Sequence, residues 1–340
     1  MQEPVLGPAV SVVVPTFNRR LSLRRLLEGL TAQSFPASQF EVIVVDDGST
    51  DGTAELLRDL VLPYRLQLVK QEHGGPAAAR NLGVARARGE LIVFLDDDVV
   101  PARNLISAHV GTHTAALDTV VIGPMSPPAT SWLRPAWIRW EEEKLQVQYR
   151  AMLAGEYACT PRQFYTGNAS LPRARFLESG GFDTTYSRAE DVELAYRLRD
   201  RGARFIFNPV ADVTHYPSRT FDAWCRTPYQ YGRYDVAMHR DKQHEAWPCA
   251  VREFHGRHFL TRMLIRLSVG RRSVANAVLR ALRGCLAVAS QLGAQRRASF
   301  VLSAIFNLQY WQGASDELGG RARVLEALAR SRRQLGMVAA

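Results

Sequence analysis

Short apolar runs alternate with helical patterns four times within the first 100 residues of the chain. The runs cover 10–14, 41–45, 66–69 and 91–95, and the segments between them carry leucine or alanine at helical spacing. Runs of this length predict buried strands, and strands that alternate with helices are typical of a doubly wound, mostly parallel sheet. The sequence therefore predicts an α/β fold for this region.

Polar side chains follow three of the predicted strands. Thr16 comes after the first strand and Asp46 after the second, and the fourth runs directly into Asp96, Asp97 and Asp98. Ligands of open α/β sheets bind at the carboxyl ends of the strands, so we expect these residues to meet in one cleft. Adjacent carboxylates are costly to bury without a cation. Carboxylates suit Mg²⁺ and Mn²⁺, so we predict a divalent cation here, with a solvated loop or helix cap as the alternative.

A second acidic group begins the predicted helix at 191–201. Glu190 and Asp191 lie where negative charge interacts favourably with the helix dipole, which is a sufficient structural explanation. The functional alternative is that one carboxylate faces the cleft and acts as a general base. Neighbouring helical residues point about 100° apart. Only one of Glu190, Asp191 and Glu193 can therefore point at a given atom.

Two further residues have both a structural and a functional interpretation. Arg80 lies on the helix that follows a glycine loop at 74–75. It is either an exposed helical arginine or a contact to a nucleotide. His215 follows a short strand-like run, and is either structural or a neutral imidazole ligand of the same cation.

The positive charge of the chain is concentrated near its C-terminus. Residues 261–340 contain 13 Arg, no Lys and 3 acids, so they account for the whole formal net charge of +10. Amphipathic or apolar helices are predicted at 273–290, 300–311 and 321–333. Across 255–340 we expect either packing and homo-oligomer contacts or peripheral membrane association through arginine and anionic headgroups. No nucleic-acid motif is present, so no nucleic-acid partner is predicted.

The spacing of the cysteines and the lengths of the apolar runs give an expectation for the cellular location of the protein. Cys159, Cys225, Cys249 and Cys285 are far apart and predict neither a disulfide framework nor a zinc site. The segment MQEPVLGPAV lacks a basic region followed by an apolar run, so we predict no signal peptide. No apolar run reaches the length of about 18 residues that a membrane span needs. The expected location is cytoplasmic, with peripheral contact at the inner face of the membrane as an alternative.

Several motifs occur in an order that resembles glycosyltransferase family 2. They are VVVPTFNR, VVDDGSTDGT, GGPAAARNLGVARARGELIVFLDDDV, GNASLPR, GGFD, AEDVELAYRLRDRG and VTH, and the resemblance covers about 9–220. It implies a GT-A fold with a doubly wound mixed sheet, and the helical pattern near the C-terminus adds a helical extension. The predicted divisions are a nucleotide-sugar-binding half at 1–110, an acceptor-binding and catalytic half at 111–250 and an Arg-rich helical extension at 251–340.

The same resemblance implies an activity and a set of site residues. The activity is inverting transfer of a sugar from a nucleotide diphosphate, UDP being favoured, to a saccharide, lipid-linked or small-molecule hydroxyl. The residues implied to bind the nucleotide are Pro15, Thr16, Phe17, Asp46, Arg80 and Asp97. The implied ligands of Mn²⁺ or Mg²⁺ are Asp98, Asp96 and His215. Asp191 is implied as the catalytic base, with Glu190 and Trp224 on the acceptor side.

Two other functions compete with this one. A sugar-nucleotide nucleotidyltransferase also uses carboxylates at strand ends, but it would have a glycine-rich basic loop after the first strand. The residues there, Pro15 to Asn18, include no glycine. A non-catalytic binding protein on the same fold is the other alternative, and the presence of both Asp98 and Asp191 argues against it.

Overall fold

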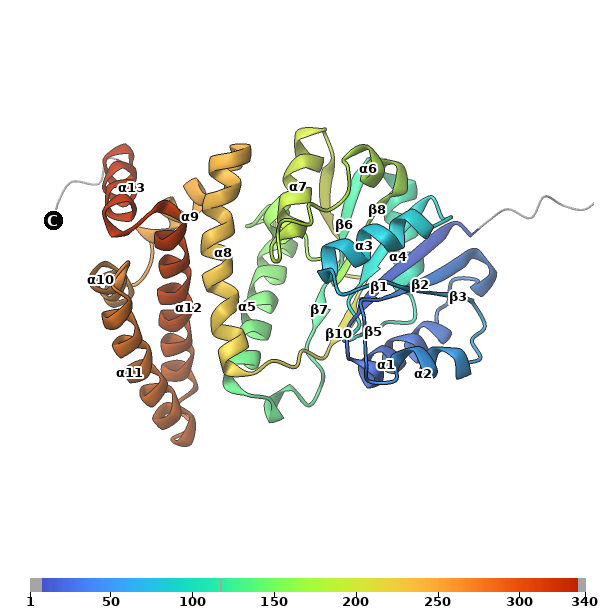
Figure 1. The fold of residues 1–340 in the computed structure, drawn as a ribbon, viewed down its shortest axis with the longest axis horizontal. Helices are drawn as coiled ribbons and strands as arrows, with labels where there is room; N and C mark the ends of the chain where they lie inside the picture. Colours follow the sequence, from blue (N-terminus) through green and yellow to red (C-terminus); the bar gives the residue numbers. More distant parts are fainter. Residues whose placement is uncertain (1–7, 117, 336–340) are drawn as a thin grey trace, which may run out of the picture. The chain divides into compact units, whose positions relative to one another are not determined.

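The structure of the protein is a computed structural model that describes residues 8–116 and 118–335. Residues 1–7 lie outside the described residues. They include most of the N-terminal segment for which no signal peptide is predicted. The chain divides into two compact units, one formed by 1–133 with 142–217 and the other by 134–141 with 218–340 (Figure 1). The division at 110 and 250 stays a prediction.

The first unit is built on a seven-stranded sheet in the order β3-β2-β1-β4-β8-β6-β9. The strand β8 runs antiparallel to its neighbours β4 and β6, and the remaining pairs are parallel. This mixed, mostly parallel sheet confirms the predicted fold class. The strands are β1 (Val10–Thr16), β2 (Phe40–Asp46), β3 (Arg65–Lys70), β4 (Leu91–Leu95), β6 (Thr119–Ile122), β8 (Asn168–Pro172) and β9 (Arg204–Phe207).

Helices cover both faces of this sheet (Figure 1), which explains why its central strands are mostly apolar, with the exception of Ser11 and Glu41, which are hydrogen-bonded to each other. Side chains alternate along β1, so Val12 packs with α1 on one face and Val13 packs in the core that contains α3 on the other. A Cβ on Gly83 would lie 2.5 Å from Val13 Cγ1, so glycine allows α3 to approach the sheet. The helices are α1 (Arg20–Thr31), α2 (Thr53–Asp59), α3 (Gly75–Arg86), α4 (Leu105–Ala115), α6 (Arg173–Glu178) and α7 (Glu190–Asp200), with 3₁₀ turns η1 (Ala37–Gln39), η2 (Ser131–Leu133) and η3 (Pro161–Gln163).

A second, three-stranded sheet fixes the segment that follows the three acids. It consists of β5 (Val99–Pro101), β10 (Val213–His215) and β7 (Met125–Ser126) in the order β5-β10-β7. In the antiparallel pair of β5 and β10, His215 lies opposite Val99. The backbone N–H of Tyr216 also donates a 2.8 Å hydrogen bond to the carbonyl of Asp98. This pairing brings His215 next to the acidic cluster.

The second unit is helical, and α5 (Ala136–Leu153) contributes its first residues to it. The helices predicted at 273–290, 300–311 and 321–333 are confirmed as parts of α11, α12 and α13. Helical structure also begins before these predicted helices, because α8 starts at Phe221. The unit contains α8 (Phe221–Lys242), α9 (Ala246–Phe254), α10 (Phe259–Ser268), α11 (Arg272–Gln291), α12 (Gln295–Leu318) and α13 (Arg321–Gln334).

Two glycines allow the backbones of α8 and α12 to approach each other closely. A Cβ on Gly232 of α8 would lie 1.9 Å from the Tyr310 carbonyl oxygen, and one on Gly313 of α12 would lie 1.9 Å from that of Tyr229. The helices α8 and α12 therefore pack against each other at two glycines. Among the described residues, no helix is long and apolar enough to cross a membrane.

Candidate active site

The loops that follow β1 and β2 are tied together at the carboxyl edge of the sheet. The backbone N–H of Asn18 donates to Ser49 Oγ at 2.8 Å, and Asn18 Oδ1 accepts from the N–H of Thr50 at 2.8 Å. Asn18 has φ of 52°, a left-handed conformation that asparagine adopts more readily than most residues. These bonds hold the two predicted nucleoside-binding loops in one place.

An exposed aromatic pair lies at this edge. The rings of Phe17 and His73 are stacked with centroids 4.3 Å apart, and Phe17 is 41% exposed. Thr16 of β1 lies opposite Asp46 of β2, and Pro15, the residue before Thr16, is half-buried. Asp46 Oδ1 accepts a 2.9 Å hydrogen bond from the N–H of Ser49. Flat rings beside a fixed carboxylate form a surface on which a base can stack. The structure thus brings Pro15, Thr16, Phe17 and Asp46 to one edge, and their contact with a nucleoside stays a prediction.

Asp47 has a structural role that the sequence analysis missed. Its carboxylate accepts hydrogen bonds from the N–H of Gly74 at 2.7 Å, the N–H of Gly75 at 2.9 Å and the side chain of Gln71 at 2.6 Å. The carboxylate thereby satisfies backbone donors at the start of α3. A glycine pair at the start of a predicted helix was the only sequence signal for this contact.

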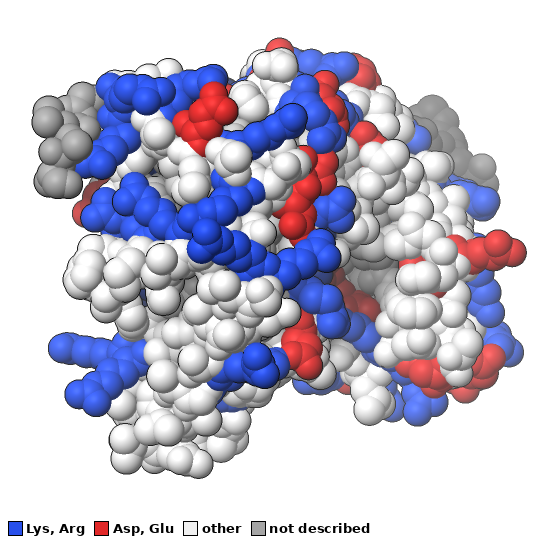
Figure 2. Space-filling model, turned by 60° about the vertical axis from the view of Figure 1, so that its left-hand side comes forward, with Lys and Arg blue, Asp and Glu red and all other residues white. Residues whose placement is uncertain are grey.

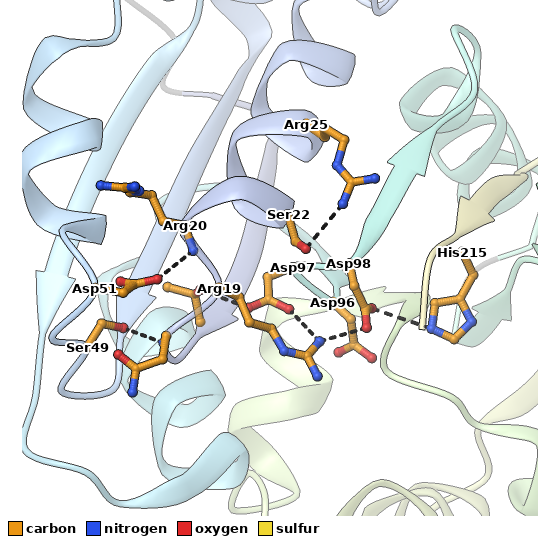
Figure 3. Close-up of polar contacts among 12 residues, drawn as sticks. Arg19, Arg20, Ser22, Arg25, Ser49, Asp51, Asp96, Asp97, Asp98 and His215 are labelled. Atoms are coloured by element: carbon orange, nitrogen blue, oxygen red, sulfur yellow. Dashed lines mark hydrogen bonds and ion pairs between the residues drawn. The ribbon is translucent and has the colours of Figure 1, made fainter. Parts of the chain in front are cut away.

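Arg19 bridges two of the three acids at the end of β4. Its Nη1 lies 3.1 Å from Asp97 Oδ1 and 2.7 Å from Asp98 Oδ2. Figure 3 shows the guanidinium between these carboxylates and His215 beside Asp98, with His215 Nε2 3.4 Å from Asp98 Oδ1. Thr16 Oγ1 also donates to Asp97 at 2.8 Å. Arg19 was not among the predicted site residues, although it ends the motif VVVPTFNR.

The surroundings of Asp97 and Asp98 separate their acidities. Burial raises the pKa of Asp97 to about 6, although the charge of Arg19 and the hydrogen bond from Thr16 oppose this rise. Burial also disfavours the charged form of Asp98, but the hydrogen bond and charge of His215, with Arg19, lower its pKa to about 2. Asp98 is therefore the member of the pair that is fully ionised at neutral pH.

Asp96 points to a different cation. Arg80 Nη2 lies 2.7 Å from Asp96 Oδ1, and Arg80 Nη1 lies 3.0 Å from Glu190 Oε1. The Arg80 side chain is only 6% exposed, so the buried guanidinium links the end of β4 to the start of α7. A Cβ on Gly167 would lie 2.9 Å from Asp96 Oδ2, so glycine leaves room for this carboxylate. In this structure both terminal nitrogens of Arg80 bind carboxylates. Its contact with a base or diphosphate therefore stays a prediction.

Of the three acids in the first turn of α7, arginine holds two. Glu190 binds Arg80, and the fully buried Glu193 forms two bonds of 2.7 and 2.6 Å with Arg197. Among the described residues, the half-buried Asp191 carboxylate accepts a single hydrogen bond, from the N–H of Val192 at 2.8 Å. Asp191 is thus the acid of this turn that is left for another partner.

Two features of the surroundings of Asp191 are unusual. Burial and the neighbouring charge of Glu190 raise the pKa of Asp191 to about 7, against the lowering effects of the Val192 N–H and the Arg80 charge. Ala189, directly before this turn, has φ of 63°, a conformation that costs a non-glycine residue of order 1–3 kcal/mol. Strained backbone and shifted pKa values gather at functional sites, which makes Asp191 a candidate catalytic residue.

The predicted metal ligands are only partly brought together. Among residues 8–116 and 118–335, no group of three or more His, Cys, Asp or Glu side chains could hold a metal ion. Asp98 and His215 are adjacent, whereas Asp96 is bound to Arg80. Mg²⁺ is usually held by one or two protein carboxylates together with substrate phosphates and water. Binding of a divalent ion by Asp98 and His215, with a diphosphate supplying the other ligands, stays a prediction, and Arg19 holds one oxygen of Asp98 in this structure.

Trp224 lies in the other unit, within the core of the helical part. Its side chain is fully buried, and its ring centroid is 5.8 Å from that of Trp140. A residue in this position packs the core and does not face solvent in this structure. Its predicted place on the acceptor side has no support from these contacts.

Comparison with known proteins identifies the family of the N-terminal part of the chain. The family model described as Glycosyl transferase family 2 matches residues 11–160, which include β2 to β4, all but the first residue of β1, and the three acids at the end of β4. The chain carries a glycosyltransferase family 2 domain. The remaining site residues, Glu190, Asp191 and His215, lie beyond the matched residues.

Two relatives show the extent of the similarity. A validoxylamine A glucosyltransferase of Streptomyces hygroscopicus subsp. jinggangensis is 33% identical over 226 residues, which are 57% of this chain and 52% of the relative. A pre-mycofactocin glycosyltransferase of Mycobacterium tuberculosis is 30% identical over 235 residues, 67% of this chain and 48% of the relative. The chain spans about half the length of these curated relatives.

Solved glycosyltransferase structures share the fold of this family 2 protein. The mannosyltransferase PcManGT of Pyrobaculum calidifontis, in complex with GDP-Man and Mn²⁺, has a TM-score of 0.59 and 22% identity, covering 91% of this chain and 88% of that one. Staphylococcus aureus TarS in complex with UDP has a TM-score of 0.53 and 20% identity, with 91% of both chains covered. These likenesses confirm the GT-A fold and leave the substrate open.

Proposed function

We propose that the protein is an inverting glycosyltransferase that moves a sugar from a nucleotide diphosphate donor to a hydroxyl acceptor, with Asp191 as the general base. The observation that carries this proposal is that arginine holds Glu190 and Glu193 but leaves Asp191 available, with its pKa raised to about 7. A base whose pKa lies near the working pH is the most effective one for taking a proton from a hydroxyl group.

The proposed reaction is a single displacement. The acceptor hydroxyl gives its proton to the Asp191 carboxylate as its oxygen forms a bond to the anomeric carbon of the donor sugar. The bond from that carbon to the diphosphate oxygen breaks, and the nucleoside diphosphate leaves with the electron pair. One attack inverts the anomeric centre and needs no enzyme nucleophile, whereas a double displacement would need a second carboxylate as nucleophile.

The donor is proposed to lie along the carboxyl edge of the sheet. Phe17 and Asp46 contact the base in this arrangement, and Asp97 approaches the ribose. Asp98 and His215 hold Mn²⁺ or Mg²⁺, which when bound stabilises the charge that develops on the leaving diphosphate. An Asp46 carboxylate can accept a hydrogen bond from a ring N–H next to a carbonyl group, which uracil, thymine and guanine all provide, and we favour UDP.

The acceptor proposal is limited to a hydroxyl compound: a saccharide, a lipid-linked sugar or a small molecule. We propose that catalysis takes place in the cytoplasm, with peripheral contact at the inner face of the membrane as the alternative. Transfer of a nucleotide rather than a sugar, as in a nucleotidyltransferase, and binding without turnover are the alternatives that an assay of products separates.

We expect Mn²⁺-dependent release of a nucleoside diphosphate when the protein is incubated with a panel of nucleotide sugars. Asp98→Asn keeps the size of the side chain but removes the charge that attracts a cation. It should weaken Mn²⁺ binding, measured by calorimetry in the presence of the nucleoside diphosphate, by about tenfold or more. Asp118→Asn, an exposed acid paired with Arg175, is the matched control and should bind Mn²⁺ as the wild type does. Conversion of a nucleotide sugar and added pyrophosphate into a nucleoside triphosphate and a sugar 1-phosphate would instead identify a nucleotidyltransferase, and no turnover of any donor would indicate a binding protein.

Sugar transfer should rise with pH through about 7 and then level off. Asp191 accepts a proton only when ionised, and its pKa of about 7 means that acid pH leaves it protonated. The charged groups that act on it are Glu190 and Asp96, which raise its pKa, and Arg80, which lowers it. The measurement is kcat/KM between about pH 5.5 and 8.5. A flat profile over that range would contradict the assignment of the base.

A further inference from the structure

One long segment of the helical unit contains no acidic residue. Residues 254–315 include no Asp or Glu and nine arginines, namely Arg257, Arg262, Arg266, Arg271, Arg272, Arg280, Arg283, Arg296 and Arg297. This segment forms α10, α11 and most of α12. The positive charge of the chain is therefore concentrated on these helices and the turns between them.

Six of these arginines form no ion pair with a described acid, because only Arg257, Arg272 and Arg283 have an acidic partner. Arg272 is 3.1 Å from Asp316 and Arg283 is paired with Asp222. Arg271, Arg280, Arg296 and Arg297 are exposed, and their guanidinium groups form no ion pair with any described residue. Their charges are available to an anionic partner.

The outer face of α10 is apolar. Phe259, Met263 and Leu267 recur every four residues and are 61%, 47% and 51% exposed, respectively. The residues that α10 buries lie on its opposite face: Thr261, Ile265 and Ser268. Helix geometry therefore gathers three large apolar side chains on the side that faces water.

A groove of about 760 Å³ lies between α11 and the start of α12. Val288 and Leu292 line it and are 55% and 72% exposed, and Phe300 forms part of its wall. Arg296 and Arg297 also line the groove. An apolar groove is thus bordered by two of the unpaired arginines.

The groove and the apolar side of α10 form one continuous surface. The ring of His258 lies 4.9 Å from that of Phe259 and 5.1 Å from that of Phe300. We call this surface the α10–α12 face. Its members are Phe259, Met263, Leu267, Val288, Leu292, Phe300, Arg296 and Arg297. Figure 2 shows basic side chains interspersed with uncharged areas over the C-terminal helices.

We propose that the α10–α12 face binds the surface of an anionic lipid bilayer. Exposed apolar side chains enter the boundary between headgroups and acyl chains, while arginines beside them attract anionic headgroups. A second copy of the chain fits this face poorly, because it would bring unpaired arginines against one another. Nucleic acid would use the arginines but would leave Met263, Leu267 and Leu292 in water. A bilayer uses both kinds of side chain.

The test is co-sedimentation of the full chain with lipid vesicles. No sugar donor or metal is present, so the result does not depend on whether the proposed glycosyltransferase activity is correct. Vesicles of phosphatidylcholine alone are compared with vesicles of equal parts phosphatidylcholine and phosphatidylglycerol. We expect binding to the anionic vesicles at about 0.05 M NaCl and much weaker binding at about 0.5 M, where screening is strong. Binding to phosphatidylcholine alone should be at least tenfold weaker, by the contribution of the arginines.

Two pairs of substitutions at exposed positions test the two components separately. Arg296→Gln with Arg297→Gln removes charge, and Met263→Ser with Leu267→Ser removes apolar area. Each pair should lower the affinity for anionic vesicles by about tenfold. The matched controls lie in the other unit: Arg86→Gln with Arg103→Gln, and Val61→Ser with Leu177→Ser, the last two positions being 97% and 48% exposed. Both controls should bind as the wild type does.

Four results would overturn the proposal. The first is that the wild type does not bind anionic vesicles at low salt. The second is that the variants of the α10–α12 face bind these vesicles as tightly as the wild type does. The third is a wild-type dimer in light scattering that becomes a monomer in the Met263→Ser, Leu267→Ser variant, which would assign the face to a second copy. The fourth is that the wild type binds a short nucleic-acid duplex more tightly than anionic vesicles, and that the Met263→Ser, Leu267→Ser variant binds the duplex equally well.

Discussion

Replacing Asp191 by Asn is expected to lower sugar transfer by about 10²–10⁴-fold, the range that removal of a general base usually produces. The amide has nearly the same size as the carboxylate and still accepts a hydrogen bond from the N–H of Val192. It cannot take a proton from the acceptor hydroxyl. Donor affinity should change little, because the residues proposed to bind the nucleotide lie on the loops after β1, β2 and β4.

The measurements are the rate of transfer and the affinity for the nucleoside diphosphate, determined on the same preparation. Asp200→Asn is the matched control, because Asp200 is an exposed acid at the other end of α7. It should retain transfer. Near-normal turnover of the Asp191→Asn variant would exclude Asp191 as the base. Equal loss in both variants would mean that α7 tolerates neither change.

The positions of the strands could be predicted from sequence because burial on both faces leaves a direct signal. The central strands β1, β2 and β4 are mostly apolar, and each ends at or directly before a polar residue at the carboxyl edge of the sheet. Helix α8 left no such signal, because aromatic and charged residues are mixed along it and Pro228 lies inside it. Its place depends on the backbone contact at Gly232, which is a tertiary interaction.

The acidic cluster illustrates a second limit of sequence reasoning. Asp96, Asp97 and Asp98 are identical in type and adjacent, so sequence alone gives them similar roles. The structure distinguishes them by partners that lie far along the chain: Asp96 binds Arg80, Asp97 binds Thr16 and Arg19, and Asp98 also contacts His215. Which cation each acid meets follows from the pairing of distant elements, above all that of β5 with β10.

Arg80→Met is expected to destabilise the first unit by about 3 kcal/mol, near the lower end of the range for breaking a buried ion pair. Methionine fills a similar volume but leaves Glu190, whose side chain is only 8% exposed, without a counter-charge. Asp96 suffers less, because its side chain is 36% exposed and water can solvate it. The free energy of unfolding, measured by denaturant titration, tests this value. Arg175→Met breaks an exposed pair with Asp118 and should cost less than about 1 kcal/mol.

Adding Glu190→Gln to Arg80→Met should recover about 1–3 kcal/mol of this loss, because the second change removes the unpaired buried charge. Additive effects in this double-mutant cycle would show that the pair is not coupled. The same variants report on catalysis. Arg80 lowers the pKa of Asp191 and Glu190 raises it. Arg80→Met should therefore move the rise of transfer activity to higher pH, and the double variant should move it back. A purely structural role for Arg80 would change stability without moving the pH profile.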